Sequence, residues 1–451
     1  MGFNRVLSLN SATNQPTMKA DVLRKCPVTV QSKTPTTEIN AGRTVNELIS
    51  AVSMAMDIED GVKLYHGWRV AIIAADLTRA MGRDNPMETF YGGLLHDVGA
   101  VGLPYHLVHY LARQSGEPRH DERVMDPAVV SHPLLSAEIV SSLPGIVGAA
   151  RAVLDHHEDW NGHGFPRGLH DTEIGVDAQI LHAADTADLM LRDGETDALD
   201  SLVARIAGLA SARLSADVAE CLIEQLCGGL YESLMDTDCL PDLFESSRAQ
   251  VGKIPVERGV DAIGITLDVL SRVVDNKHPY TIGHSRRVAR YSLLIGIAMG
   301  LEHDDLTMLK WAALIHDVGK LSVPTHMLDK PGALSPEEYQ VLQFHVSYTF
   351  DIVSMITDLR PVAAVASSHH ERHDGNGYPL GWAADDIPLG AQIIAVSDAF
   401  DAMTSQRPYR SLNDVTAACR ELQDKAGSQF NPDVVRVAVP VLRNLGLVIV
   451  G

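Results

Sequence analysis

Apolar residues recur at helical spacing along two long stretches of the chain, from about residue 45 to 235 and again from about 258 to 445. The stretch RVAIIAADLTRAMG (69–82) shows this pattern in the first half, and RVARYSLLIGIAMGL (287–301) shows it in the second. Alternating apolar and polar runs, which would indicate strands, are scarce. The pattern therefore predicts an all-α protein with two mainly helical domains.

Two segments lack this periodicity. Residues 1–44 are rich in Thr, Ser, Asn, Gln and Pro over most of their length, and they predict an irregular N-terminal arm. Residues 235–259 carry Pro, Gly and mixed charges without a clear apolar stripe, which is typical of a connection between domains. We therefore expect one domain over residues 45–240, a linker over 241–258 and a second domain over 259–451.

Composition narrows the class of protein. A chain of 451 residues with 45% hydrophobic content is typical of an ordinary globular protein with two or three packed domains. No apolar run of about 18 residues occurs, and the N-terminus lacks the apolar core of a signal peptide. Five cysteines without CxxC spacing indicate free thiols in a reducing compartment. We expect a cytoplasmic protein with no membrane segment.

The charge of the chain limits its partners. A formal net charge of −21 would repel a polyanion, so we expect no polymeric nucleic acid as a partner. A small anionic ligand could still bind in a local basic pocket. The oligomeric state stays open at this level.

The two halves repeat the same order of histidine and aspartate residues. Residues 132 and 156 are 24 apart, as are 345 and 369, and residues 157 and 185 are 28 apart, as are 370 and 398. The flanking segments repeat as well: HGWRVA and HSRRVA, LLHDVGA and LIHDVGK, HHEDWNGHGFP and HHERHDGNGYP. The first set is His66, His96, Asp97, His132, His156, His157 and Asp185, and the second is His284, His316, Asp317, His345, His369, His370 and Asp398.

This repeat favours a metal site. A single histidine on an apolar helix is more often a buried core residue than a ligand, but seven such groups in the same order in both halves reverse that preference. Imidazole and carboxylate groups suit Fe, Mn, Ni or Zn, and the absence of cysteine argues against a closed structural zinc site. Five histidines and two aspartates exceed the needs of one ion. We expect two divalent transition-metal ions that share a bridging carboxylate, with Fe or Mn favoured and Ni or Zn as alternatives.

The second half resembles the HD-GYP family of metal-dependent phosphohydrolases, which hydrolyse cyclic dinucleotides in bacteria. The resemblance covers about residues 260 to 440 and rests on HDVGK, LDKPGALSPEEY, HHERHDGNGYP, IPLGAQIIAVSDAFDAMTSQRPYR and GSQFNPDVV, in that order. It implies two tandem HD-type domains, each built on a five-helix HD core with extra helices. The family's metal-ligand pattern falls on all seven residues of the second set, with Asp317 as the bridging, catalytic ligand.

The resemblance also assigns further residues of the second domain. Lys320 lies three residues after Asp317, so on a continuing helix its ammonium can point toward the scissile phosphate and stabilise the transition state. Tyr378 and Pro379 would form a stiff lip at the substrate channel. Three more side chains are expected to contact the substrate: Arg407 and Arg410 through phosphate oxygens, and Asp401 through a guanine edge.

The resemblance implies cyclic di-GMP as the default substrate, hydrolysed to pGpG, GMP or both. Members of the family with a third metal carry a glutamate where this chain has Tyr280, which favours two ions. An acidic residue linked to base contacts is replaced by His278, so 3'3'-cyclic GMP-AMP is an alternative substrate. A cyclic-dinucleotide sensor or scaffold without turnover is an alternative of another class, whereas the GYP and RPYR segments argue against nucleoside triphosphate hydrolysis.

The first half keeps every ligand type but lacks the residues expected to act on phosphate. Ala100 stands where the second half has Lys320, Phe165 stands for Tyr378, Asn161 stands for Asp374, and the arginines of RPYR have no counterpart. We therefore expect a degenerate HD-GYP-like domain without hydrolytic activity. Its predicted role is to pack on, stabilise or regulate the second domain, and its cluster is a candidate for a second metal site.

Overall fold

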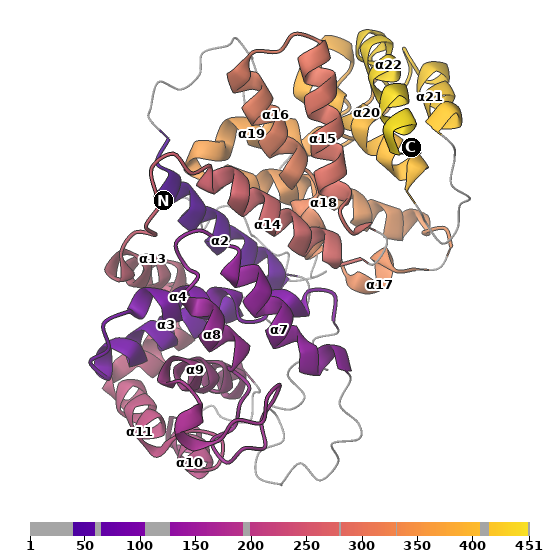
Figure 1. Ribbon diagram of the computed structural model, residues 1–451. Coiled ribbons are helices and arrows are strands. Elements are labelled where there is room, and N and C mark those ends of the chain that lie inside the picture. The colour runs from indigo at the N-terminus through magenta and orange to yellow at the C-terminus, as the bar shows by residue number, and fades with distance from the viewer. Residues whose placement is uncertain are drawn as a thin grey trace. The chain divides into compact units, whose positions relative to one another are not determined.

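The computed structural model describes residues 39–58, 65–103, 127–192, 199–278, 281–330, 332–405 and 415–449. These ranges are helical and contain no strand, so the predicted all-α class is confirmed (Figure 1). Two isolated bridges occur, one between Ala210 and Leu214 and one between Ala426 and Phe430. None of the described helices combines the length and the apolarity that crossing a bilayer requires.

Residues 41–269 form one compact unit and residues from 270 onward belong to the other, so the division falls inside helix α14. The first unit contains α2 (Ala41–Ile58), α3 (His66–Ala80), α4 (Pro86–Leu95), α7 (Pro127–Ser141), α8 (Ala149–Leu154), α9 (Val176–Arg192), α10 (Leu199–Leu209), α11 (Ala216–Gln225), α12 (Tyr231–Met235) and α13 (Leu240–Val251). The second contains most of its helices after α14 (Ala262–Asn276): α15 (His284–Ala298), α16 (His303–Ile315), α17 (Thr325–Leu328), α18 (Pro336–Ser354), α19 (Arg360–Ser367), α20 (Leu389–Thr404), α21 (Val415–Asp424) and α22 (Pro432–Ile449).

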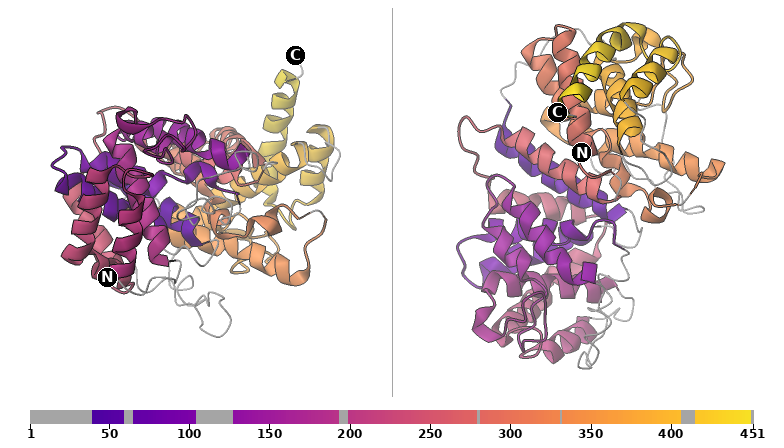
Figure 2. Two further views of the ribbon diagram at one scale, coloured as in Figure 1. Left: turned by 90° about the horizontal axis from the view of Figure 1, so that it is seen from below. Right: turned by 45° about the vertical axis from the view of Figure 1, so that its right-hand side comes forward.

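Corresponding helices pack in the same way within each unit, and both views of Figure 2 show each unit as a bundle of helices. In the first, α3 packs on α4 and α9, and α7 packs on α8 and on the short 3₁₀ helix η2 (Val98–Ala100). In the second, α15 packs on α16 and α20, and α18 packs on α19 and on η6 (Val318–Ser322). The sequence repeat is therefore a repeat of structure.

The segment predicted as a linker is largely helix. Helix α13 packs on α3 and α4, and the ring of Phe244 stacks on that of Trp68 with centroids 4.1 Å apart. Leu240, Phe244 and Val251 are buried and lie at helical spacing. Pro241 made the segment resemble a loop, but a proline in the first turn of a helix loses no intrahelical hydrogen bond. Residues 240–251 thus form a helix that packs within the first unit, whereas the sequence predicted a linker over 241–258.

Close backbone contacts place the HD motif against the helix that carries the third histidine. A Cβ on Gly319 would lie 1.9 Å from the carbonyl oxygen of His345, so only glycine allows η6 to approach α18 this closely. Thr349 on α18 accepts a hydrogen bond from the Gly319 N–H at 3.0 Å and donates to the His316 carbonyl at 3.0 Å. A capping box between Ser335 and Glu338 fixes the start of α18.

Candidate metal centre

The seven predicted ligands of the second unit come from five parts of the helical bundle and meet in its interior. His284 begins α15, His316 and Asp317 follow α16, and His345 lies in α18. His369 and His370 follow α19, and Asp398 lies in α20. Potential ligand atoms lie within 4.8 Å of one another in the group His284, His316 and Asp398 and in the group His345, His369 and His370. A third such group, His316, Asp317 and His369, connects these two groups.

The carboxylate of Asp317 lies between these two groups. Its Oδ2 is 3.4 Å from His316 Nε2 and 3.8 Å from His284 Nε2. Its Oδ1 is 3.5 Å from His345 Nε2 and 3.9 Å from His369 Nε2. Such separations are too long for hydrogen bonds, but they leave room for an ion bonded to both atoms at about 2.0–2.2 Å. Each oxygen of Asp317 faces one group, as a bridging ligand requires.

Hydrogen bonds select the tautomer of three of the histidines. The Nδ1–H groups of His316, His345 and His369 donate to backbone carbonyl groups at 2.9, 2.6 and 2.7 Å. Since neutral imidazole carries one proton, each Nε2 then presents a lone pair to the centre. These Nε2 atoms and Asp317 Oδ1 are buried without a hydrogen-bond partner. Buried acceptors that converge in this way fit divalent cations, because one cation can bind several of them at once.

Protonation states agree with this fit. Burial lowers the pKa of His345 to about 3 and that of His370 to about 4. Burial alone would raise the pKa of Asp317, but the ammonium of Lys320 and the surrounding imidazoles hold it well below its usual range. At neutral pH the imidazoles of His345 and His370 are neutral and the carboxylate of Asp317 is ionised, and these are the forms that bind a metal.

The structure places Asp401 behind His284. Its side chain is buried, and its Oδ2 accepts a hydrogen bond from His284 Nδ1 at 2.8 Å. Arg287 donates to both of its oxygens, at 2.6 and 3.0 Å. The predicted contact between Asp401 and a guanine edge stays a prediction, and in this structure both oxygens of Asp401 are bonded to protein groups. A carboxylate in this place orients the imidazole and directs its Nε2 toward the centre.

The HHERHDGNGYP segment folds back over the two adjacent histidines. Glu371 accepts hydrogen bonds from the backbone N–H groups of Leu380 and Trp382 at 2.6 and 3.0 Å, which holds the end of the loop. A Cβ on Gly377 would lie 2.4 Å from the backbone nitrogen of Arg372 and 2.6 Å from the carbonyl oxygen of His370, so only glycine fits at this point of the loop. Sequence reasoning missed Glu371, although the first half repeats it as Glu158 in HHE.

A cavity of about 690 Å³ opens beside the ligands of the second unit. Lys320 lines it, and its Nζ lies 2.5 Å from Asp317 Oδ2. Tyr378 also lines it and stacks on His370, with ring centroids 4.9 Å apart. The volume falls within the range of small-molecule sites. The structure thus joins Lys320 and Tyr378 to the metal-ligand cluster.

The remaining residues named in the sequence analysis fall partly outside the described ranges. Arg407 and Arg410 lie outside the described residues, as does Tyr280. Pro379 is half-buried and follows Tyr378 through a cis peptide bond. His278 forms an ion pair with Asp329.

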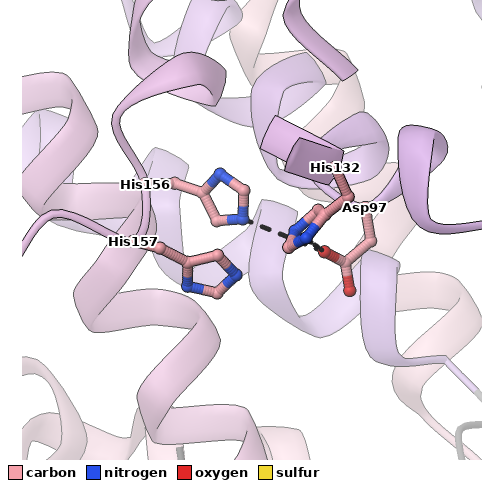
Figure 3. Close-up of side chains that lie close together, drawn as sticks. All are labelled: Asp97, His132, His156 and His157. Atoms are coloured by element: carbon pink, nitrogen blue, oxygen red, sulfur yellow. Dashed lines mark ion pairs between the residues drawn. The ribbon is translucent and has the colours of Figure 1, made fainter. Parts of the chain in front are cut away.

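The first unit gathers its seven counterparts in the same arrangement. Figure 3 shows Asp97 facing His132 and His156, with Asp97 Oδ1 at 3.2 and 3.8 Å from their Nε2 atoms. His66, His96 and Asp185 form the second group of ligand atoms. The repeat seen in the sequence therefore extends to the side-chain geometry.

Comparisons with known proteins agree with this geometry. A family model described as HD domain matches residues 51–204 and 268–434. The 3'3'-cGAMP-specific phosphodiesterase 3 of Vibrio cholerae is 31% identical over 66% of this chain and 64% of its own length. A cyclic di-GMP phosphodiesterase of Thermotoga maritima is 37% identical over 38% of this chain and 46% of its own length. The chain thus spans less than two thirds of the length of either relative.

Two further similarities extend over both units. The 3'3'-cGAMP-specific phosphodiesterase 1 of Vibrio cholerae is 28% identical over 81% of this chain and 84% of its own length. The crystal structure of a cyclic GMP-AMP specific phosphodiesterase of the same organism covers 88% of this chain with a TM-score of 0.60 and 24% identity, which supports the fold.

Proposed function

The chain belongs to the HD domain family, as the resemblance in its sequence predicted, and from this premise we propose that its second unit is a metal-dependent phosphodiesterase acting on a cyclic dinucleotide. The observation that carries the proposal is the joining of a bridged His and Asp cluster, Lys320 and a cavity of about 690 Å³ in one place. Divalent ions in such a site activate water and neutralise charge on phosphoryl oxygens.

The residues of the second unit then have distinct roles in hydrolysis. Asp317 would bridge the two ions, with one histidine group binding each. Lys320 lies at the border between Asp317 and the cavity, where its ammonium can stabilise negative charge that develops on the phosphate. Tyr378 would shape the site for a nucleotide base, because its ring lines the cavity. Arg407 and Arg410 remain our candidates for phosphate contacts.

We propose two ions in the second unit, with Fe or Mn favoured over Ni or Zn. The support is the ligand chemistry, five imidazoles and two carboxylates without a thiolate.

The first unit, in this proposal, does not hydrolyse the substrate. Ala100 replaces Lys320, and the space that corresponds to the cavity carries larger side chains. Matching hydrogen bonds show that Arg213 of the first unit corresponds to Gln429 of the second. The Trp160 N–H donates to the Arg213 carbonyl at 3.0 Å, and the His373 N–H donates to the Gln429 carbonyl at 3.2 Å. Gln429 lines the cavity of the second unit.

Three of the replacements fill this space. His182 stands for Ala395, Leu189 for Ala402 and Arg213 for Gln429. His182 and Leu189 are buried, and the Arg213 guanidinium contacts both Asp159 and His182. A cyclic dinucleotide would have to displace these side chains. We therefore propose that the first unit stabilises or regulates the second.

Two substrates remain candidates. Cyclic di-GMP is the default, and the presence of His278 where an acidic residue was expected leaves 3'3'-cyclic GMP-AMP beside it. Two 3'3'-cGAMP-specific relatives match this chain over 66% and 81% of its length, whereas a third matches 37% and the Thermotoga relative matches 38%. The two longer matches favour testing the mixed dinucleotide beside cyclic di-GMP.

The test is hydrolysis of both cyclic dinucleotides by the full chain loaded with Mn²⁺, with products separated by chromatography. We expect one of them to be cleaved to a linear dinucleotide or mononucleotides. Asp317→Ala should abolish the activity, because the first unit cannot replace it. Binding of either dinucleotide without any product would favour a sensor, and residual turnover in Asp317→Ala would contradict the division of labour between the units.

A further inference from the structure

Metal-ligand geometry in the first unit is as complete as in the second. Asp97 Oδ1 faces His132 and His156 (Figure 3). Its Oδ2 lies 3.6 Å from His96 Nε2. Asp185 Oδ1 is 3.6 Å from His66 Nε2 and 3.7 Å from His96 Nε2. One oxygen of Asp97 thus faces each ligand group, as with Asp317.

Hydrogen bonds again turn the Nε2 atoms toward the centre. The Nδ1–H groups of His96, His132 and His156 donate to backbone carbonyl groups at 2.8, 2.6 and 2.6 Å. Their side chains are at most 2% exposed, and their Nε2 atoms have no hydrogen-bond partner. His66 Nδ1 lies 2.6 Å from Asp188, which repeats the pairing of His284 with Asp401.

A purely structural role for these histidines does not explain this orientation. A buried histidine that only fills space would be expected to satisfy both ring nitrogens, since an unsatisfied buried acceptor is costly. Here the Nε2 atoms of all three histidines converge on the carboxylate of Asp97, at 3.2 to 3.8 Å. Lys320, which supplies positive charge beside Asp317 in the second unit, has Ala100 as its counterpart. Seven imidazole and carboxylate groups that converge in this way fit divalent cations.

We propose that the first unit binds two divalent ions in a closed centre whose purpose is to hold the unit together. One ion would be bound by His66, His96 and Asp185, and the other by His132, His156 and His157, with Asp97 between them. This inference goes beyond the proposed function, because it assigns ions to the unit that does not hydrolyse the substrate.

The position of the ligands explains a stabilising role. They belong to α3, to the turn after α4, to α7, to the turn after α8, and to α9, so two ions would connect five parts of the bundle. Phe165 packs on His157 with ring centroids 4.8 Å apart, and His182 and Arg213 occupy the space beyond. Ions that bind only the folded unit raise its stability by mass action.

The experiment counts ions in the full chain. Protein stripped with a chelator is reloaded with Mn²⁺ alone, desalted and analysed by inductively coupled plasma mass spectrometry. We expect about four ions per wild-type chain, and about two in either Asp97→Asn or Asp317→Asn, because each carboxylate bridges one pair. His170→Ala is the matched control, since His170 is exposed and outside the cluster, and it should keep the wild-type count.

A second measurement covers the case in which Asp97→Asn does not fold. The Asp317→Asn chain, which keeps the first centre intact, should show a higher melting temperature after Mn²⁺ loading than after stripping, and His156→Ala in that background should remove the increase. About two ions in the wild type, both lost in Asp317→Asn, would overturn the proposal. Failure of the wild type to hydrolyse either dinucleotide would contradict the proposed function but leave this ion count unaffected.

Discussion

Replacing Asp401 by asparagine separates a residue that positions a ligand from one that contacts substrate. Asp401 accepts one hydrogen bond from His284 and two from Arg287, all between 2.6 and 3.0 Å. Burial by itself raises its pKa, but these bonds lower the pKa below its ordinary value, so the group is ionised at neutral pH. Asparagine keeps the shape of the side chain but loses its negative charge. Its NH₂ group would face one of the donors on His284 or Arg287, and it cannot accept a hydrogen bond from that donor.

The size of the effect follows from the bonds that change. A hydrogen bond involving a charged group contributes about 1.5–3 kcal/mol, and at least one of the three is lost in Asp401→Asn. If that loss falls on the orientation of His284, the Mn²⁺ affinity of the second unit should drop by roughly 10- to 100-fold, the range seen when a group that orients a metal ligand is removed. The two estimates agree, since a factor of ten corresponds to about 1.4 kcal/mol.

The assay is a Mn²⁺ titration of stripped protein, with hydrolysis as the readout at each metal concentration. We expect a higher half-activating concentration of Mn²⁺ for Asp401→Asn, with kcat returning close to that of the wild type at saturating metal and KM nearly unchanged. Asp433→Asn is the control, because Asp433 pairs with Arg436 on the surface and its side chain is 75% exposed. Unchanged metal activation together with a raised KM would refute our reasoning and restore a substrate contact.

Three further predictions concern the same unit. Lys320→Ala should keep its metal content but lose turnover by a factor on the order of 10², measured as kcat, because one preorganised cation is removed; an effect on KM alone would contradict this role. Gly377→Ala should lower the free energy of unfolding by about 1–3 kcal/mol or more in urea titrations and also reduce hydrolysis, whereas Gly164→Ala should affect stability alone. Stripped protein reloaded with Fe²⁺ or Mn²⁺ should hydrolyse faster than protein reloaded with Zn²⁺, and fastest turnover with zinc would count against our assignment.

Much of the architecture was predictable from the chain because local periodicity and repetition encode it. Helical spacing of apolar residues predicted an all-α protein, and the equal separations in the two halves predicted both sets of seven ligands. Asp317 and Asp97 each stand next to a histidine in a repeated HD motif. Because the same fold is built twice, it brings the repeated histidine and aspartate side chains together in each unit.

Sequence reasoning gave two signals less weight than they carry. Pro241 suggested a loop, although Leu240, Phe244 and Val251 form an apolar stripe on α13. Asp401 was predicted to contact a base, and Asp188 repeats it in the half that lacks the groups for acting on phosphate. In both halves this aspartate is hydrogen-bonded to the first histidine of the set, which favours a role that both halves share.

The remaining features depend on contacts between residues far apart in the chain. The bond between His284 and Asp401 joins residues 117 positions apart, and it decides which nitrogen of the imidazole faces the centre. In the first unit, His182 and Arg213 fill the space that corresponds to the cavity of the second. They do so because α9 and the segment before α11 lie next to each other, which brings the two side chains into contact. Periodicity reports which face of a helix is buried, but it carries no information on which atoms meet there. The amino-acid order therefore predicted the helices and the candidate ligand set. The tertiary structure decided which ring nitrogen of each histidine faces the centre, and it decided that the second unit has a cavity at its cluster whereas larger side chains fill the corresponding space in the first.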